Sequence, residues 1–203
     1  MQNAIIIEPG IRPHHLEQAA LGYWQAFAQK LAWPLGPQAK ALDFLKDNLN
    51  PSHAISAVSP EGDFLGVAGF KTKNGAFVGG DFDALAKTYG TLSAVWRGLL
   101  ISVLERECEP KTLLMDGVFV TPQSRGLGVG SQLLDAIVDH ARAQGLDRVR
   151  LDVIDTNPRA RALYERKGFV ASGEQKMGLL KPVFGFSSAT TLVKPVPAEQ
   201  TKP

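Results

Sequence analysis

The chain has 203 residues, 44% of them hydrophobic and 21% charged, which is the composition of a soluble globular protein of one domain. Its formal net charge of +2, with basic and acidic residues mixed throughout, gives no basic patch of the kind that nucleic-acid-binding proteins carry. No stretch approaches the roughly 18 apolar residues of a membrane span, and no signal peptide is recognisable. A lone cysteine, Cys108, excludes an internal disulfide. We therefore expect a cytoplasmic protein without nucleic-acid or membrane partners.

The first half of the chain predicts a strand, two helices, a β-hairpin and a third helix. The evidence is helical or alternating spacing of apolar side chains, punctuated by Pro and Gly. In chain order we expect a strand at 4–8, a helix at 14–31 that Trp33-Pro34 ends, a helix at 39–49, hairpin strands at 53–59 and 64–70, a glycine-containing segment, and a helix at 91–107.

The second half alternates strands and helices. It predicts a strand at 113–120, a glycine-rich loop, a helix at 131–144, a strand at 148–154, a helix from Asn157 to Gly168, a strand from Phe169, a loop at 176–188 and a strand at 189–196. We therefore expect one α/β domain over 1–196, with a central, twisted, mixed and mostly antiparallel sheet flanked by helices. A flexible polar tail is expected at 197–203.

The loop QSRGLGVG, residues 123–130, separates a predicted strand from a predicted helix and carries Gly126, Gly128 and Gly130. Such a turn brings backbone N–H groups and a helix N-terminus to one point, which attracts phosphate. A side chain at any of these glycines would hold a phosphate away from the amides, and Arg125 could add a charged contact. One glycine would suit a tight turn alone, but three favour phosphate binding.

Two common phosphate motifs fit this loop poorly. The Walker pattern GxxxxGK[ST] is absent, and the dinucleotide pattern GxGxxG requires the third glycine one residue later. A dinucleotide site is therefore the second choice here.

The segment NPRARALYERKGF, residues 157–169, carries a second signal. Asn157 and Tyr164 are seven residues apart, about 10.5 Å along a helix, and lie on nearly the same face. Alone, Asn157 would be a helix cap and Tyr164 a core residue. Together with the glycine loop they indicate a site.

These two segments resemble the GNAT superfamily of acetyl-CoA-dependent N-acetyltransferases. The acyl-donor motif Q/R-x-x-G-x-G/A of that family is met by QSRGLG (123–128) and by RGLGVG (125–130), and residues 157–169 resemble its second block. The resemblance is specific over about 113–170. It implies a GNAT-like fold, acetyl-CoA as co-substrate and no metal.

The resemblance also implies roles for particular residues. The pantetheine arm would pair with main-chain groups of Val118, Phe119 and Val120. Asn157 would contact the cofactor, and Tyr164 would protonate the departing thiolate. The pyrophosphate would be held by Arg125, Gly126, Leu127, Gly128, Val129 and Gly130.

The acceptor is expected to be a primary amine of a small molecule or a protein. Asp116 is the first candidate for the base that deprotonates it. For this and the other candidates a solvated surface charge is the plain alternative, and a water-mediated proton path or an acceptor that arrives neutral would serve equally. Further candidates are Asp81, Asp83, His14, His15 and His53. Two other functions stay open: a non-catalytic regulator that binds acyl-CoA, and a nicotinamide-dependent oxidoreductase.

Residues 71–112 are longer than the compact family pattern requires. They separate the second hairpin strand from the strand before the glycine loop and include the helix expected at 91–107. Such an insert could form a lid over the acceptor site or an interface in a homodimer.

Overall fold

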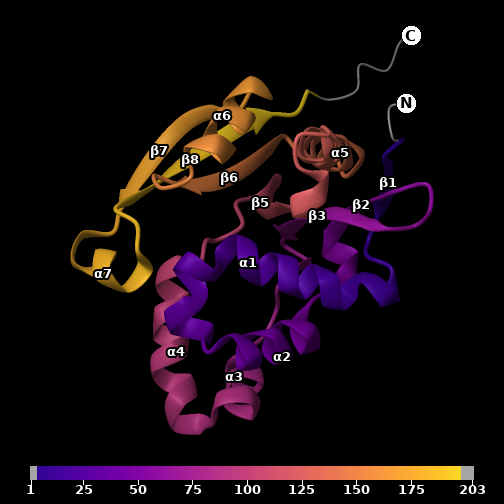
Figure 1. Ribbon diagram of the computed structural model, residues 1–203. Helices are drawn as coiled ribbons and strands as arrows, with labels where there is room; N and C mark the ends of the chain where they lie inside the picture. Colours follow the sequence, from indigo (N-terminus) through magenta and orange to yellow (C-terminus); the bar gives the residue numbers. More distant parts are fainter. Residues whose placement is uncertain (1–3, 198–203) are drawn as a thin grey trace.

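In the computed structural model, which describes residues 4–197, a single eight-stranded sheet organises the chain (Figure 1). The strand order is β1-β2-β3-β5-β6-β8-β7, with β4 beside β3. Among the paired strands of the described residues, only β5 and β6 run parallel. The prediction of a mixed, mostly antiparallel sheet is therefore confirmed. The strands are β1 (Ile6–Pro9), β2 (Ala54–Val58), β3 (Phe64–Thr72), β4 (Gly75–Ala76), β5 (Thr112–Val120), β6 (Arg148–Ile154), β7 (Val170–Lys176) and β8 (Ser188–Pro195).

Helices cover both faces of the sheet. Figure 1 shows α5 and α6 on one face and α1 on the other, with α2, α3 and α4 beyond α1. The helices are α1 (Leu16–Leu35), α2 (Gln38–Asn48), α3 (Phe82–Tyr89), α4 (Thr91–Leu104), α5 (Val129–Ala143), α6 (Pro158–Arg166) and α7 (Lys181–Phe184). No helix among the described residues is long and apolar enough to cross a bilayer.

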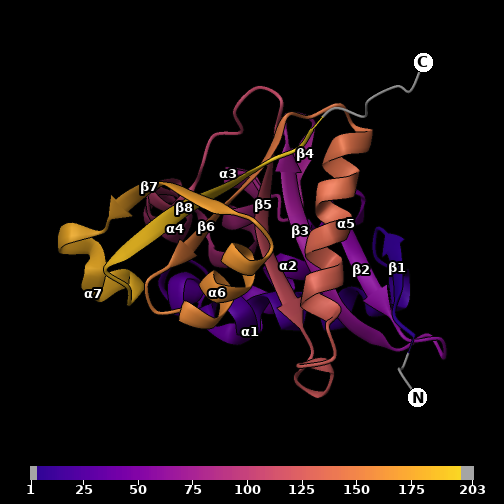
Figure 2. The same cartoon turned by 90° about the horizontal axis from the view of Figure 1, so that it is seen from above.

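The main core lies between the sheet and α5. Leu133, Leu134 and Ile137 recur at helical spacing and are fully buried against β2, β3 and β5, over which α5 lies in Figure 2. In α6, Tyr164 and Leu163 join the same core. The glycine loop and residues 157–169 are thereby placed at neighbouring points of one face.

Helix α1 approaches β5 closely on the other face because two glycines leave room for aromatic rings. A Cβ at Gly22 would lie 2.3 Å from the Phe119 ring, and one at Gly117 would lie 2.0 Å from the Phe27 ring. This contact holds the second half of α1 against the centre of β5.

The expectation that Trp33-Pro34 ends the first helix is wrong. Helix α1 continues through Pro34 to Leu35, because its last carbonyls find donors in the insert. Arg97 of α4 donates to the carbonyls of Trp33 and Pro34, and the hydroxyl of Tyr89 donates to that of Leu35. These contacts are distant in sequence, so local patterns could not show them.

Two short helices were not expected from the sequence. Helix α3 begins at Phe82, at the end of the glycine-containing segment, and is capped by Asp81, whose carboxylate accepts from the amide of Ala84 at 2.9 Å. Helix α7 interrupts the loop expected at 176–188, and its Phe184 is fully buried. The helix predicted at 91–107 ends earlier, at Leu104.

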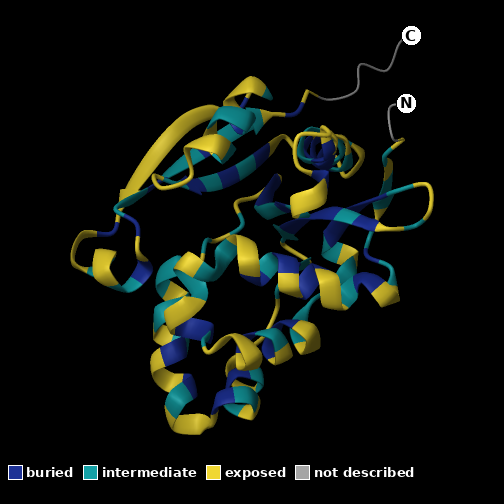
Figure 3. Ribbon diagram, in the orientation of Figure 1, coloured by how far each residue is buried: buried dark blue, intermediate teal, exposed yellow. Residues whose placement is uncertain are grey.

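The insert packs as a helical layer rather than as an exposed flap. Leu85, Tyr89 and Ala94 are buried with Trp24 of α1 and Phe44 of α2. Strand β7, by contrast, is exposed along its whole length (Figure 3). The flexible tail expected from residue 197 lies, except for Pro197, outside the described residues.

Candidate functional site

Strands β5 and β6 separate in the middle of the sheet. Their pairing runs only from Thr112 opposite Arg148 to Met115 opposite Leu151. Beyond this point β5 continues to Val120 paired with β3 alone, and β6 continues to Ile154 paired with β8 alone. Figure 2 shows the two strands diverging toward the end at which α6 lies. We call this opening the β5–β6 gap.

A β-bulge in β5 sets which groups face the gap. The pairing with β3 passes from Gly117 directly to Met115, so Asp116 is the extra residue. Met115 before the bulge and Val118 after it therefore share the α5 face. The direction of the Asp116 side chain, which simple alternation left open, follows from this bulge: it turns toward α1.

The main-chain groups of the three predicted pantetheine residues do not all face the gap. The amide of Thr121 donates to Leu65 of β3, and a Cβ at Gly66 would lie 2.6 Å from the Phe119 carbonyl oxygen. Alternation then directs Val118 and Val120 toward the gap and Phe119 toward β3. The expectation for Phe119 is corrected accordingly.

The glycine loop ends the gap at the start of α5. Gly126 and Gly128 have φ of +85° and +87°, and a Cβ on either would meet nothing within 4 Å. They are needed for the backbone turn, and the space beside them is open. Gly130 has an ordinary φ, and its Cβ would face Leu163 and Val120 across the gap at 3.5 and 3.6 Å.

The amides at this turn have no partners. Within the described chain, no acceptor takes a hydrogen bond from the amides of Gly126, Gly128, Val129 or Gly130, and no side chain caps α5. Unpaired amides at a helix N-terminus bind anions. Arg125 lies beside them, exposed, with its Nε 3.4 Å from the carbonyl oxygen of Val120.

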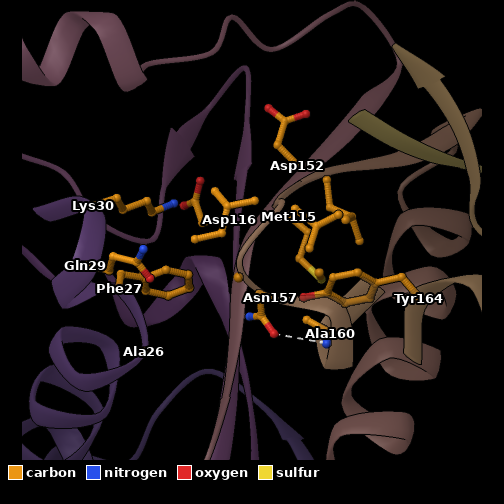
Figure 4. A pocket seen from close by; sticks show the side chains of 14 residues that line it. Ala26, Phe27, Gln29, Lys30, Met115, Asp116, Asp152, Asn157, Ala160 and Tyr164 are labelled. Atoms are coloured by element: carbon orange, nitrogen blue, oxygen red, sulfur yellow. Dashed lines mark hydrogen bonds between the residues drawn. The ribbon is translucent and has the colours of Figure 1, made fainter. Parts of the chain in front are cut away.

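A cavity of about 50 Å³ lies in the gap between β5, β6, α1 and α6 (Figure 4). Asn157 caps α6 by accepting from the amide of Ala160 at 3.1 Å, which leaves its amide nitrogen beside the cavity. Tyr164 is only 8% exposed, and its hydroxyl points into the cavity without a hydrogen bond to any residue drawn. Burial raises the pKa of Tyr164 to about 12.

Asp116 and Lys30 face each other across the same cavity (Figure 4). Partial burial raises the pKa of Asp116 from its ordinary value of 3.8 to about 6, although the ammonium groups of Lys30 and Lys71 oppose the shift. Burial lowers the pKa of Lys30, and Asp116 and Asp152 oppose that shift. A carboxyl group that titrates near neutrality is suited to general base catalysis.

A larger cavity, of about 390 Å³, adjoins the first on the α1 side of the sheet. The two cavities share Lys30, Met115, Asp116, Asp152 and Ile154. Its remaining walls come from α1, α2, the insert and the residues around β8, and most of them are apolar, including Leu31, Leu35, Phe44, Val78, Ile101, Leu104 and Phe186. We call it the acceptor cavity, after the role that we propose for it below. The insert thus contributes directly to its wall.

The other candidate bases lie away from both cavities. Asp81 caps α3, and Asp83 is exposed in its first turn. The Nδ1 of His53 contacts Asn50 and Ser52, while its Nε2 contacts Thr72. His14 and His15 precede α1, at the opposite end of that helix from Lys30. Of the predicted bases, only Asp116 lines the cavities.

Lys30, Arg106 and Asp152 were missed as members of the site. Lys30 follows Tyr23 and Phe27 on one face of α1, and a cation at the end of an aromatic stripe was the available signal. Arg106 comes from the insert and pairs with Asp152 of β6 at 3.1 Å. No local sequence pattern links these two residues.

Comparison with known proteins agrees with this geometry. The sequence profile of the acetyltransferase (GNAT) family matches residues 20–169. Over 50 residues the chain is 52% identical to a mycothiol acetyltransferase from Beutenbergia cavernae, which is 25% of this chain and 17% of that protein. Over 126 residues it is 29% identical to the uncharacterized N-acetyltransferase YhfO of Bacillus subtilis, which is 62% of this chain and 65% of that protein. The chain thus spans less than two thirds of either relative.

Solved structures share the fold at low identity. A GCN5-related N-acetyltransferase from Kribbella flavida superposes with a TM-score of 0.64 at 16% identity, over 95% of this chain and 98% of that one. An N-acetyltransferase from Staphylococcus aureus gives a TM-score of 0.63 at 14% identity, over 93% and 100% of the two chains. At these identities the likeness concerns the fold.

Proposed function

The chain belongs to the acetyltransferase (GNAT) family, and we propose that it transfers the acetyl group of acetyl-CoA directly to a primary amine of a small molecule or a protein. The observation that carries this proposal is the β5–β6 gap. It presents unpaired strand groups along one side, ends at unpaired amides of α5 and meets a cavity that holds Asp116.

The residues of the gap fit acetyl-CoA. The main-chain groups of Val118 and the amide of Val120 are available to pair with the amides of the pantetheine arm, as an added strand would, while the Val120 carbonyl accepts from Arg125. The amides of Gly126, Gly128, Val129 and Gly130, with Arg125, are suited to the pyrophosphate. Bound there, acetyl-CoA supplies the thioester carbonyl that an amine attacks.

Asp116 acts as the base in this proposal. Its carboxylate takes a proton from the acceptor ammonium group, and the neutral nitrogen then forms the C–N bond as the C–S bond breaks. Strand amides at the gap polarise the carbonyl oxygen. The second proton of the nitrogen is lost as the thiolate gains one, and Asp116 returns its proton to solvent.

In this proposal Tyr164 stabilises the leaving thiolate. With a pKa of about 12, its phenol keeps its proton at neutral pH and donates a hydrogen bond to the departing thiolate. Because the pKa is raised, complete transfer of the phenol proton to a thiolate, whose conjugate acid has a pKa of about 8.5, is less favourable than transfer from an ordinary phenol would be. Stabilisation by hydrogen bonding is therefore the larger part of its role.

The insert forms one wall of the acceptor cavity in this proposal. Ile101, Leu104, Glu105 and Arg106 all line that cavity. An interface in a homodimer stays a prediction for the outer face of the insert, where Leu92 and Leu99 of α4 are 91% and 66% exposed.

A screen of acetyl-CoA consumption against a panel of amines, with calorimetric binding of acetyl-CoA as control, tests the proposal. We expect binding together with turnover of at least one amine. Binding without any turnover would favour the non-catalytic regulator. Binding of a nicotinamide dinucleotide in place of acetyl-CoA would favour an oxidoreductase.

A further inference from the structure

The charges of the acceptor cavity are balanced in pairs, with one exception. Lys71 pairs with Glu105 at 3.1 Å, and Arg106 pairs with Asp152 at 3.1 Å. Asp152 also accepts from the hydroxyl of Thr191 at 2.6 Å. These four charged groups have partners within the described protein and do not require a charged ligand.

The exception is Lys30 with Asp116. The two side chains point toward each other in Figure 4, yet no hydrogen bond joins them there, and no ion pair within 4 Å involves either one among the described residues. The ammonium of Lys30 instead lies 4.6 Å from the centroid of the Phe27 ring. Both groups are partly buried. The Asp116 carboxylate lies within reach of the backbone amide of Phe77, whereas Lys30 has no anionic partner within 4 Å among the described residues. Groups in that state favour ligands that supply the opposite charge.

Apart from these charged groups, most of the residues that line the cavity are apolar, and the cavity is small. Leu31, Leu35, Phe44 and Ile101 are among these apolar residues. A volume of about 390 Å³ lies near the lower end of ligand pockets, which span about 300–1,000 Å³. The cavity suits a compact apolar group joined to a charged head.

We infer that the acceptor is an apolar α-amino acid or a close analogue. Lys30 binds its carboxylate, its ammonium group lies beside Asp116, and its side chain occupies the apolar end of the acceptor cavity. This inference rests on the proposed function and specifies the amine. A monoamine without an anionic group would leave Lys30 without a partner, and a polyamine would place further cations beside it and against apolar walls.

The test uses matched amines that differ only in the anionic group. Leucine, leucinamide and 3-methylbutylamine form one such set, and methionine and phenylalanine with their amides form two more. Spermidine is added as a polycation. The full-length protein is assayed with acetyl-CoA, and the ratio of kcat/KM for each acid to that of its amide is the readout.

Wild type should favour at least one acid over its amide by roughly tenfold or more, the effect of a single charged contact. Lys30→Gln should bring that ratio close to one through a higher KM for the acid, whereas Lys30→Arg should keep most of it. Lys40→Gln removes the same charge from an exposed site on α2, outside both cavities, and should change neither the ratio nor the affinity for acetyl-CoA.

Three results would overturn this inference without overturning the proposed function. These are turnover restricted to spermidine, equal or better turnover of the amides or the alkylamine, and a preference for acids that survives in Lys30→Gln. Each leaves acetyl transfer to an amine standing. If no amine of the panel is acetylated although acetyl-CoA binds, the proposed function fails and the inference fails with it.

Discussion

At the scale of single residues, a substitution of Tyr164 can distinguish an effect on the stability of the fold from an effect on catalysis. Tyr164→Phe keeps the buried ring and removes a hydroxyl that has no hydrogen-bond partner among the residues around the cavity. We expect kcat to fall by about 10²–10³-fold, the effect of removing one hydrogen-bond donor to a charge that develops in the transition state, with little change in acetyl-CoA affinity or Tm.

The matched control is Tyr89→Phe, which removes a hydroxyl that bonds to the carbonyl of Leu35. It should lower stability by about 1 kcal/mol and leave kcat within a few-fold. Enzyme kinetics and thermal unfolding of both variants give the comparison. Tyr164 is a core residue without a chemical role if its variant loses stability instead of kcat.

Asp116 should govern the pH dependence of activity. Its pKa of about 6 means that the carboxylate, the form that accepts a proton, is lost as the pH falls through 6. The charged or titratable groups around it are Tyr23 and Lys30 of α1, Lys71 of β3, Glu105 and Arg106 of the insert and Asp152 of β6. We expect kcat/KM to rise with pH through about 6 and this step to be absent in Asp116→Asn. An unchanged profile in that variant would assign the step to another group.

The same substitution should stabilise the protein. Because the folded state raises the pKa of Asp116 from 3.8 to about 6, its carboxylate is disfavoured there. The penalty grows as the pH rises through that window, is complete above about pH 6 and is at most about 3 kcal/mol. Asp116→Asn should therefore raise Tm at pH 7 and not near pH 3.5. A lower Tm at pH 7 would show that the carboxylate has a structural partner.

At the scale of elements, the N-terminus of α5 can be tested with one added charge. Gly130→Glu places a carboxylate at an ordinary φ, facing the gap between Val120 and Leu163. An acidic residue in a first helical turn is favourable in itself, so the fold should hold while acetyl-CoA affinity falls by at least about tenfold, or 1.4 kcal/mol.

The control, Gln132→Glu, adds the same charge to the same helix at an exposed position on the side of β1. Its affinity for acetyl-CoA by calorimetry should stay within a few-fold of wild type. Equal losses in the two variants would mean that general charge, and not a phosphate site in the gap, explains the effect.

Arg97 of α4 links the insert to α1 by hydrogen bonds. This side chain is 9% exposed, donates to two carbonyls of α1 and stacks 4.1 Å from the centroid of the Tyr89 ring. Arg97→Met should lower the free energy of unfolding by about 1–3 kcal/mol and raise KM for the acceptor, because Lys30 lies on the same helix. Acetyl-CoA affinity should not change.

Arg142→Met breaks an exposed ion pair with Asp139 instead. It should alter stability by no more than about 0.5 kcal/mol. Denaturant unfolding measures the free energy of unfolding of both variants, and steady-state kinetics measures their KM for the amine and for acetyl-CoA. If Arg97→Met raises KM for acetyl-CoA as strongly as for the amine, the insert does not act through the acceptor cavity.

At the scale of the whole molecule, the sequence predicted best what local patterns encode. The order of the predicted strands and helices, the glycine turn and the cap at Asn157 are local, and the structure confirms them, although it adds β4, α3 and α7. The extension of α1 past Pro34, the burial of Phe184 in α7 and the pairing of Arg106 with Asp152 depend on residues far apart in the chain. The same holds for Lys30, which meets Asp116 only because Gly117 lets Phe27 of α1 approach β5.

The central claim is that acetyl-CoA lies in the β5–β6 gap, and hydrogen exchange read at single amides tests it most directly. The amides of Val118 and Val120 and those of Gly126, Gly128, Val129 and Gly130 should exchange rapidly in the free protein and gain protection on addition of acetyl-CoA. The amide of Phe119, which faces β3, should already be protected, and NAD should protect none of them. Protection by acetyl-CoA at other amides, with these unchanged, would contradict the account.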